Sequence, residues 1–344
     1  MEGEGPVSNE TLYAVLTTIR EPSPATRRMK EALDRTGGRL IIIGDRNGPA
    51  SFPLEGTSLF LLQDQERLPF RLARLLPFGH YARKNLGYLV AIRDGASCIY
   101  DTDDDNSPLA SWRARPKAVP VRKAKRAAWV NSYRFFTDEK VWPRGFPLRL
   151  AREDDPPSID GDGETFIVDA PVQHGLADTS PDVDAVWRLL LDRALHFRSG
   201  ASIILPPGSW CPFNSQSTWW RPPAWPLLYL PSHCSFRMTD IWRSFVAQRC
   251  LWELGIGVVF HSSEVDQERN SHDLMEDFQE EIPGYLGNEK MVRVLDETRL
   301  APGTNAIGDN LLQCYERLTK AGFFREGELH LVHAWRDDLK DLSK

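Results

Sequence analysis

The feature that most constrains this chain is a short apolar segment that runs directly into a group of carboxylates. Residues 97–100, Ser-Cys-Ile-Tyr, predict a buried strand, and four of the next five residues are aspartates. Carboxylates this close together cannot be buried without a cation. Asp101 and Asp103 are spaced to reach one divalent ion, with Asp105 as a third ligand, and such an ion keeps positions for water and phosphate oxygens. We therefore expect a metal that holds a nucleotide diphosphate, and the alternative is a solvated acidic turn.

The composition predicts a large soluble protein. The chain has 344 residues, of which 41% are hydrophobic, and a net charge of −6. This is enough for a large core, in two lobes or in one domain with insertions. No apolar run reaches the roughly 18 residues that a membrane-spanning helix needs, and the N-terminus is polar rather than signal-like. We therefore expect a cytoplasmic protein with no membrane span.

The cysteine content and the charge balance argue against a disulfide-rich protein, a structural zinc protein and a nucleic-acid-binding protein. Five cysteines without a CxxC pair argue against a disulfide framework and against a structural zinc site. The mildly acidic balance argues against a nucleic-acid partner. One basic run, residues 113–126, holds seven Lys or Arg residues and is expected to form a solvated loop. The alternative is a contact with an anionic substrate beside the acidic loop.

The N-terminal third predicts a strand-helix-strand unit. Residues 12–19 and 39–44 are apolar and rich in β-branched side chains, and residues 22–36 have helical apolar spacing. A parallel sheet is therefore expected, with nucleotide chemistry at its carboxyl edge. Polar side chains follow both strands, and we expect them to hold a base and ribose: Thr17, Thr18 and Arg20 after the first, Asp45 after the second. Turn formation alone is the alternative, above all for Asp45.

A helix is predicted at residues 83–95, directly before the acidic strand end. Its first turn carries Arg83, Lys84 and Asn85, where free backbone N–H groups and two cations make an anion site. Thr102, inside the acidic segment, joins this set of expected nucleotide contacts. Surface charge at a helix start is the alternative.

The second half of the chain supplies the expected acceptor side. A rigid Pro-flanked turn contains Trp142 and Arg144, and a polar segment after a strand at 202–205 contains Asn214 and Gln216. Residues 180–196 predict an amphipathic helix, with Pro181 or Asp182 near its start.

A long helix and a strand follow. Residues 236–254 predict a helix whose start presents Asp240, either as a general base or only as an N-cap. Residues 255–261 predict a strand that ends in His261, which either completes the metal site or is merely hydrogen-bonded.

Four segments together resemble the STELLO-type glycosyltransferases, in the same order and over roughly residues 11–290. They are RKNLGYLVAIRDGASCIYDTDDDN, VWPRGFPL, PFNSQST and FRMTDIWRSFVAQRCLWELG. The plant members are Golgi proteins linked to cellulose synthesis, but this sequence lacks their membrane anchor, so that location and partnership are not expected here. The resemblance implies an α/β fold with a GT-A-type, Rossmann-like nucleotide-sugar-binding core, a mixed sheet and a helical C-terminal extension. It also implies a sugar-nucleotide donor and Mn²⁺ or Mg²⁺ at Asp101 and Asp103.

The implied organisation has three parts. Residues 1–150 form the nucleotide-sugar-binding half with the acidic metal loop, residues 151–264 form the acceptor-side half, and residues 265–344 form the helical extension.

A weaker likeness is to the UDP-arabinopyranose mutases, also called reversibly glycosylated polypeptides. They share the three-carboxylate loop, an Arg-Gly-aromatic-Pro turn like that at Arg144, and a strand that ends in His-Ser, as at His261. The arginine of that turn is glycosylated in the mutases, so Arg144 is either a sugar carrier or a diphosphate contact.

Our leading hypothesis is metal-dependent transfer of a sugar from a UDP- or GDP-linked donor to an unidentified acceptor. Asp240 is the expected base and Arg243 orients it, while Trp142, Asn214 and Gln216 shape the acceptor side. The alternatives are a nucleotide-sugar mutase that works through Arg144, and an inactive scaffold that binds sugar nucleotides.

Overall fold

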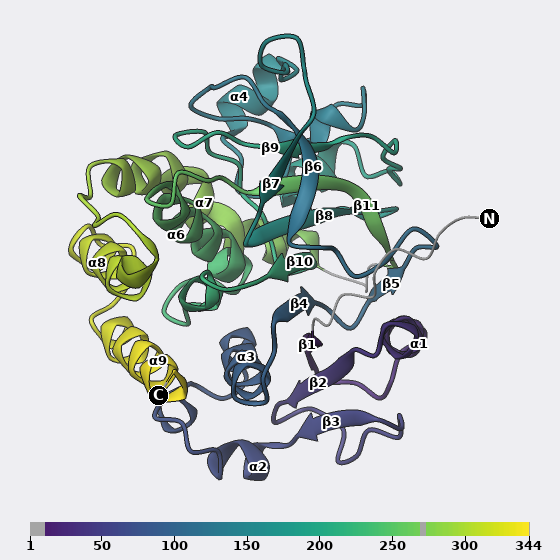
Figure 1. The fold of residues 1–344 in the computed structure, drawn as a ribbon, viewed down its shortest axis with the longest axis vertical. Helices are drawn as coiled ribbons and strands as arrows, with labels where there is room; N and C mark the ends of the chain where they lie inside the picture. The colour runs from purple at the N-terminus through teal and green to yellow at the C-terminus, as the bar shows by residue number, and fades with distance from the viewer. Residues whose placement is uncertain (1–10, 269–272, 344) are drawn as a thin grey trace.

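One mixed sheet organises the part of the chain that the structure, a computed structural model, describes: residues 11–268 and 273–343. Its strands follow the order β3-β2-β1-β4-β10-β8-β11-β9-β6-β7, and β5 pairs with β11 (Figure 1). The first four strands are parallel, and β10 enters antiparallel between β4 and β8. Strands from both halves of the chain therefore meet at the centre of the sheet, next to the acidic loop.

The strands and helices have the following bounds. The strands are β1 Leu12–Thr18, β2 Arg39–Gly44, β3 Thr57–Phe60, β4 Cys98–Thr102, β5 Asn106–Pro108, β6 Ala118–Lys123, β7 Phe166–Asp169, β8 Val172–Asp178, β9 Ser202–Ile204, β10 Ser217–Trp220 and β11 Val259–Gln267. The helices are α1 Pro24–Thr36, α2 Leu62–Glu66, α3 Lys84–Arg93, α4 Leu148–Glu153, α5 Ala185–Leu190, α6 Thr239–Trp252, α7 Leu274–Asp296, α8 Ile307–Lys320 and α9 Gly327–Leu342. Short 3₁₀ turns include η1 Leu72–Arg74, η2 Tyr81–Arg83 and η5 Phe236–Met238.

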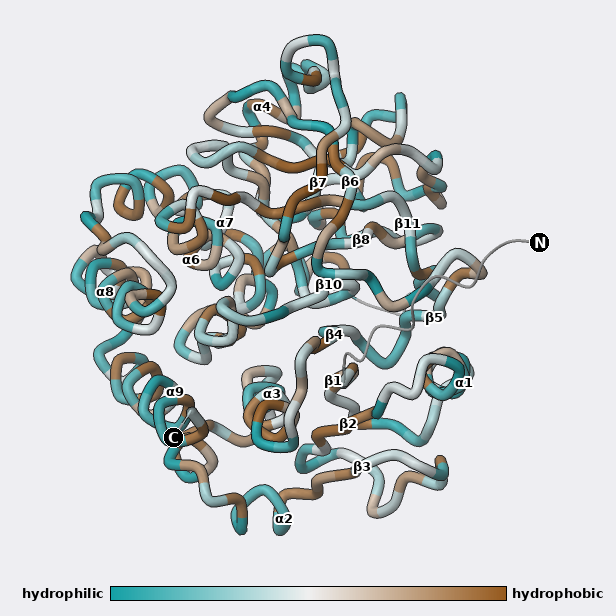
Figure 2. Tube along the Cα trace, in the orientation of Figure 1, coloured by the Kyte–Doolittle hydropathy of each residue, from teal (hydrophilic) through white to brown (hydrophobic). Residues whose placement is uncertain are grey.

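Strand β1 shows how the sheet separates two layers of core. Alternate side chains of a strand point to opposite faces. Tyr13 and Val15 belong to the large core that also holds α3, α6, α8 and α9, whereas Leu12, Ala14 and Leu16 pack with α1. Figure 1 accordingly places α1 on one side of the strands and α3 on the other. Figure 2 shows apolar residues in β2 and β7, while the outward turns of α8 and α9 are hydrophilic.

Local signals set the bounds of α1. The Ser23 hydroxyl accepts a hydrogen bond from the Thr26 amide, Pro24 occupies the first turn, and Gly37 ends the helix in the left-handed region at φ 70°. The expected strand-helix-strand unit is confirmed, with β1 and β2 in parallel register from Tyr13↔Arg39 to Thr18↔Gly44.

The C-terminal helix α9 is fastened to the first half of the chain. The Asp338 carboxylate accepts hydrogen bonds from the backbone N–H groups of Arg71 (3.0 Å) and Leu72 (3.0 Å), at the start of η1. At its other end, the buried Glu328 carboxylate accepts from the Ser232 and His233 backbone N–H groups. Helix α9 therefore packs against the first half of the chain, where it contacts α3 and η1, and Figure 1 shows it next to α3.

Two predicted elements are wrong. The helix expected at 180–196 is confined to α5, Ala185–Leu190. The backbones of Thr179 and Leu195 form a β-bridge that draws the ends of this segment together, and the Asp184 side chain caps the short helix by accepting from the Trp187 amide. The expected loop at 113–126 contains strand β6, because Val119 and Val121 alternate into a small core between β7 and β9.

The predicted fold class is confirmed: the chain is an α/β protein with a mixed sheet, a Rossmann-like GT-A core and helical C-terminal elements. Among the described residues, no helix combines the length and the apolar character needed to cross a membrane.

Candidate functional site

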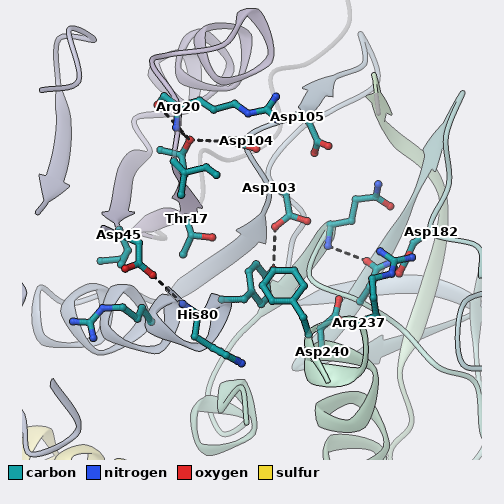
Figure 3. A pocket seen from close by; sticks show the side chains of 18 of the residues that line it. Thr17, Arg20, Asp45, His80, Asp103, Asp104, Asp105, Asp182, Arg237 and Asp240 are labelled. Carbon is teal, nitrogen blue, oxygen red and sulfur yellow. Dashed lines mark hydrogen bonds and ion pairs between the residues drawn. The ribbon is translucent and has the colours of Figure 1, made fainter. Parts of the chain in front are cut away.

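A cavity of about 520 Å³ opens at the carboxyl edge of β1, β2 and β4, where ligands of open α/β sheets bind. Figure 3 shows Thr17, Arg20 and Asp45 on one side, Asp182, Arg237 and Asp240 on the other, and Asp103 between them. The predicted site residues that line it are Thr17, Thr18, Arg20, Asp45, Arg83, Asp103, Asp105, Arg144, Asn214, Gln216 and Asp240.

Asp101 is fully buried beneath the cavity and does not line it. One carboxylate oxygen accepts from the Lys84 ammonium (2.7 Å) and the Tyr88 hydroxyl (2.7 Å), and the other from Arg243 (2.8 Å). Burial alone would raise the pKa of Asp101, but the two cations lower it. Asp101 is thus a charged anchor with both oxygens already bound.

Asp103 is the first aspartate of the loop that faces the cavity. Its Oδ1 accepts from Lys84 (3.1 Å) and from the Tyr81 hydroxyl (3.0 Å), and 32% of its side-chain surface stays accessible. Burial raises the pKa of Asp103 to about 6, since the nearby Lys84 offsets only part of that effect and Asp101 adds to it. The carboxylate therefore carries negative charge that the protein only partly compensates.

The next two aspartates play different parts. The Asp104 carboxylate accepts from the Thr18 hydroxyl (2.6 Å), and its carbonyl oxygen accepts from Ser23 (2.6 Å) at the start of α1. Asp105 accepts from the Gln267 amide (3.0 Å) through one oxygen, while its Oδ1 is buried without a partner among the described residues. Burial, together with the neighbouring Asp103 and Asp104, raises the pKa of Asp105 to about 7.

These observations test whether a divalent cation fits the loop. No group of three or more His, Cys, Asp or Glu side chains within residues 11–268 and 273–343 is gathered to hold an ion. Mg²⁺, however, is commonly bound by one or two carboxylates, with water and substrate phosphates in the other positions. Asp103 and Asp105 both face the cavity, and Asp105 has an oxygen without a partner, so this pair fits an ion that arrives with its substrate.

The N-terminal wall is held together by polar contacts. Asp45 accepts from the backbone N–H groups of Gly79 (2.9 Å) and His80 (3.0 Å), which ties the end of β2 to the segment before α3. Thr17 and Arg20 line the cavity above it. Thr102 is fully buried, and its hydroxyl donates to the Gln216 carbonyl (2.9 Å).

The first turn of α3 differs from a simple anion site. Arg83 lines the cavity, but its guanidinium donates to Gln65 (2.7 Å) and to the carbonyl of Leu76 (3.2 Å). Asn85 lies away from the cavity and bonds both the carbonyl and the amide of Leu230, at 2.8 Å each. Lys84 points into the acidic loop instead.

The opposite wall is built on Arg144. Its guanidinium makes a two-point ion pair with Asp182, Nε–Oδ1 2.8 Å and Nη2–Oδ2 2.8 Å, and Nη2 also contacts Asp240 at 3.1 Å. Its remaining nitrogen, Nη1, donates to the Arg237 carbonyl. Burial would raise the pKa of Asp182, but the Arg144 and Arg237 guanidinium groups lower it.

Asp240 is held at the start of α6. It is 8% exposed, lines the cavity, and accepts from Arg144 and from the Ser215 backbone N–H (3.2 Å). The helix begins after Met238, so Asp240 lies in its first turn and is not the N-cap residue. Arg243, one turn further, donates to Asp101 and to the Ser215 hydroxyl, at 2.8 Å each, so these hydrogen bonds position the acidic loop and Ser215.

The expected acceptor-side residues separate into two groups. Asn214 donates to Asp182 (2.9 Å) and, like Gln216, lines the cavity. Trp142 is 5% exposed, belongs to the core, and donates its indole N–H to Asp184 (2.6 Å), so it supports the wall from behind.

His261 does not line the cavity, and it is the third of the nine residues of β11 rather than the last residue of a strand. Its ring nitrogens are hydrogen-bonded to Ser202 (2.7 Å) and Gln173 (2.9 Å), and burial lowers its pKa well below the ordinary value. His261 therefore matches the alternative in which its ring is only hydrogen-bonded and does not complete the metal site.

Sequence reasoning missed several residues of the cavity. The sequence predicts Asp182 only near the start of a helix, and it predicts no role in the site for Arg237, which lies three residues before Asp240. Arg237 donates to the buried Glu281 of α7 (2.8 Å), and this partner is far along the chain. Tyr81 and Gln267 also contact the acidic loop. The sequence signal that could have indicated Tyr81 is its position shortly before the Arg-Lys-Asn motif, whereas no such signal points to Gln267.

Comparisons with known proteins give a consistent result. Residues 237–344 match a family model described as STELLO glycosyltransferases. The chain is 27% identical to "Probable glycosyltransferase STELLO1" and 26% identical to "Probable glycosyltransferase STELLO2", both of Arabidopsis thaliana. Each alignment covers 95% of this chain, which spans 44% of the length of each relative. The chain is therefore similar, over most of its length, to the STELLO-type glycosyltransferases that its four sequence motifs resemble.

Proposed function

We propose that the chain transfers a sugar from a nucleotide diphosphate donor to an acceptor hydroxyl, with the help of a divalent cation. The observation that carries this proposal is the cavity with two unlike walls. One wall presents two carboxylates whose charge the protein at most partly compensates, Asp103 and Asp105, beside the polar ends of β1 and β2. The other presents Asp240 on an arginine-carboxylate network.

The metal side is assigned to Asp103 and Asp105. When bound there, Mn²⁺ or Mg²⁺ supplies Lewis-acid stabilisation of the departing diphosphate. Lys84 holds Asp103 in place through its 3.1 Å contact, and Asp101 fixes Lys84 from below at 2.7 Å. Asp101, which the sequence predicts as a metal ligand, is instead proposed as the anchor of the loop.

The donor side is assigned to the ends of β1 and β2. Thr17 and Arg20 present polar side chains to the cavity, and Asp45 orders the segment at Gly79 and His80 that faces them. Such residues hold a nucleoside without taking part in bond breaking.

The acceptor side is assigned to Asp240 as general base. Its carboxylate lines the cavity and is oriented by the Arg144 guanidinium and the Ser215 backbone N–H. A base positioned in this way removes the acceptor proton as the new glycosidic bond forms. Asn214 and Gln216, next to it, are suited to bind the acceptor's hydroxyl groups.

The arrangement of Arg144 favours transfer over the mutase alternative. A sugar carrier needs a guanidinium nitrogen that is free to attack. All three nitrogens of Arg144 instead donate to Asp182, Asp240 or the Arg237 carbonyl, and the residue is 5% exposed. Arg144 is therefore proposed as the residue that positions Asp240.

The test is an incubation of the purified protein with UDP- and GDP-linked sugars, Mn²⁺ and a panel of sugar acceptors. We expect release of the nucleotide diphosphate together with a glycosylated acceptor, and loss of both with Asp103→Asn. Asp160→Asn, an exposed aspartate outside the cavity, serves as the matched control. A ring isomer of the donor sugar, or a sugar adduct on Arg144 seen by mass spectrometry, would replace this proposal with the mutase. Nucleotide binding without turnover of any donor would replace it with the scaffold.

A further inference from the structure

A second cavity, of about 310 Å³, lies outside the site described above. One side is formed by Trp129 and Phe146, whose ring centroids are 5.9 Å apart and whose planes are nearly perpendicular. The other side is formed by residues 153–158, which carry three acidic side chains and two prolines at the cavity. This volume lies at the lower end of the range of small-molecule sites.

The walls of this cavity are fixed by backbone hydrogen bonds. The Val130 backbone N–H donates to the Trp210 carbonyl (2.9 Å), which holds the segment that carries Trp129. Across the cavity, Lys125 donates to the Ser158 carbonyl (2.8 Å) and so closes the acidic segment against β6. The site is therefore formed before any ligand arrives.

One polar atom at the cavity lacks a partner. Asn131 donates its amide N–H to the Val141 carbonyl (2.7 Å), which fixes the orientation of the side chain. Its Oδ1 is buried and, within the described residues, has no hydrogen-bond partner. Since leaving a buried acceptor unpaired is costly, a ligand that donates an O–H or N–H there would gain binding energy.

The charges around the cavity balance. Lys125 and Arg126 are matched by Glu153 and Asp155, while the remaining carboxylate, Asp154, is bonded to Arg134. No net field favours an anion or a cation. An aromatic wall, an unpaired acceptor and two carboxylates favour a neutral molecule with several hydroxyl groups and an apolar face.

We infer that this second cavity binds a neutral saccharide, at a site separate from the proposed transfer site. The pyranose ring packs on Trp129, and its hydroxyl groups donate to Asn131 Oδ1 and to the Glu153 and Asp155 carboxylates. The inference does not depend on transferase activity. If the chain does act on glycans, this site binds a part of the saccharide that is distant from the reacting hydroxyl.

The two cavities share one rigid turn. Arg144 lines the first cavity and Phe146 lines the second, and between them Gly145 adopts φ +89°. A Cβ added to Gly145 would lie 2.5 Å from the Ile241 side chain, so this turn tolerates little change. Variants for the test should therefore avoid the turn itself.

Saturation-transfer NMR on the intact chain, with maltose and lactose as probes, tests the inference. Trp129→Leu removes the aromatic wall, and the double variant Glu153→Ala/Asp155→Ala removes two exposed carboxylates with little risk to folding. Phe236→Ala is the matched control, because Phe236 is 51% exposed and lines the first cavity. Loss of one or two hydrogen bonds predicts affinity about three- to tenfold weaker in the double variant.

The expected result is a saturation-transfer signal that weakens in both second-cavity variants and persists in Phe236→Ala. If Trp129→Leu does not fold, the double variant decides alone. The inference is overturned if neither disaccharide gives a signal with the unaltered chain, or if the signal is lost in Phe236→Ala and kept in the double variant.

Discussion

The Lys84 ammonium lies 2.7 Å from the Asp101 carboxylate, and the side chains of both residues are completely inaccessible to solvent. Lys84 also contacts Asp103 at 3.1 Å, so one buried cation joins the base of the acidic loop to its cavity-facing part. A charge that loses its partner in such surroundings is left without either water or a counter-ion. The position of the whole loop therefore depends on this ion pair.

Replacing Lys84 by Met is expected to destabilise the protein strongly. Removing one partner of a buried ion pair typically costs about 3–5 kcal/mol, and Arg243 still compensates part of the Asp101 charge, so we expect a loss near the lower end. Urea unfolding followed by tryptophan fluorescence measures it. The matched control is Lys117→Met, whose partner Asp169 is 62% exposed and whose ion pair contributes little. Equal losses in the two variants would contradict the anchoring role.

Divalent cations are expected to stabilise the protein more at high pH than at low pH. The folded state raises the pKa of Asp105 from 3.8 to about 7, so it binds a proton more tightly than the unfolded state does. The unfolding free energy of the metal-free protein therefore falls as the pH rises from 3.8 to about 7. Because a metal competes with that proton, the Tm increase caused by Mn²⁺ should be larger at about pH 8 than at about pH 5.

Asp105→Asn provides the control for the metal prediction. This variant removes the repelled charge, so its metal-free Tm at about pH 8 should exceed that of the unaltered chain, and Mn²⁺ should no longer raise it. Asp169→Asn, a 62% exposed aspartate on β7, should keep the full response. A Tm increase caused by Mn²⁺ that is independent of pH would contradict the assignment of Asp105 as a metal ligand.

Asp240→Asn is expected to abolish turnover while nucleotide binding persists. A general base typically contributes 10²–10⁴-fold, so the rate of acceptor-dependent nucleotide release should fall at least about 100-fold. The thermal shift caused by UDP or GDP should stay unchanged, because Asp240 lies on the wall opposite Thr17 and Asp45 (Figure 3). A rate within a few-fold of the unaltered chain would rule Asp240 out as the base.

Gly87→Ala and Gly308→Ala are expected to have opposite effects, although both glycines lie in helices. A Cβ at Gly87 would lie 2.5 Å from Val15 and 3.0 Å from Ile43, because α3 packs directly on β1 and β2. Overpacking of this kind costs about 1–3 kcal/mol. At Gly308 the nearest atom is the Arg336 side chain at 3.7 Å, so alanine should stabilise α8 by about 0.5–1 kcal/mol. Thermal unfolding of both variants checks the sign of each change.

The sequence by itself determined the first half of the sheet and the class of the fold. Residues 39–44 form β2 with the predicted bounds, and residues 84–93 of the predicted helix form α3, because apolar periodicity and glycine stops act over a few residues. The same local signals failed at 180–196, where a bridge between Thr179 and Leu195 overrides the helical pattern. The four motifs also indicated the similarity to the STELLO-type glycosyltransferases that the comparisons found, since motifs depend on residue order alone.

Only the tertiary structure decided which charged side chains meet. The sequence predicts Asp101 and Asp103 as the first metal ligands and Asp105 as the third, yet Asp101 lies under the cavity with Lys84 and Arg243, while Asp103 and Asp105 face it. Arg144 pairs with Asp182 and Asp240, which lie 38 and 96 residues away. Ion pairs depend on distances of a few ångströms between side chains from different elements, and packing sets those distances. The spacing of residues along the chain does not specify these side-chain distances.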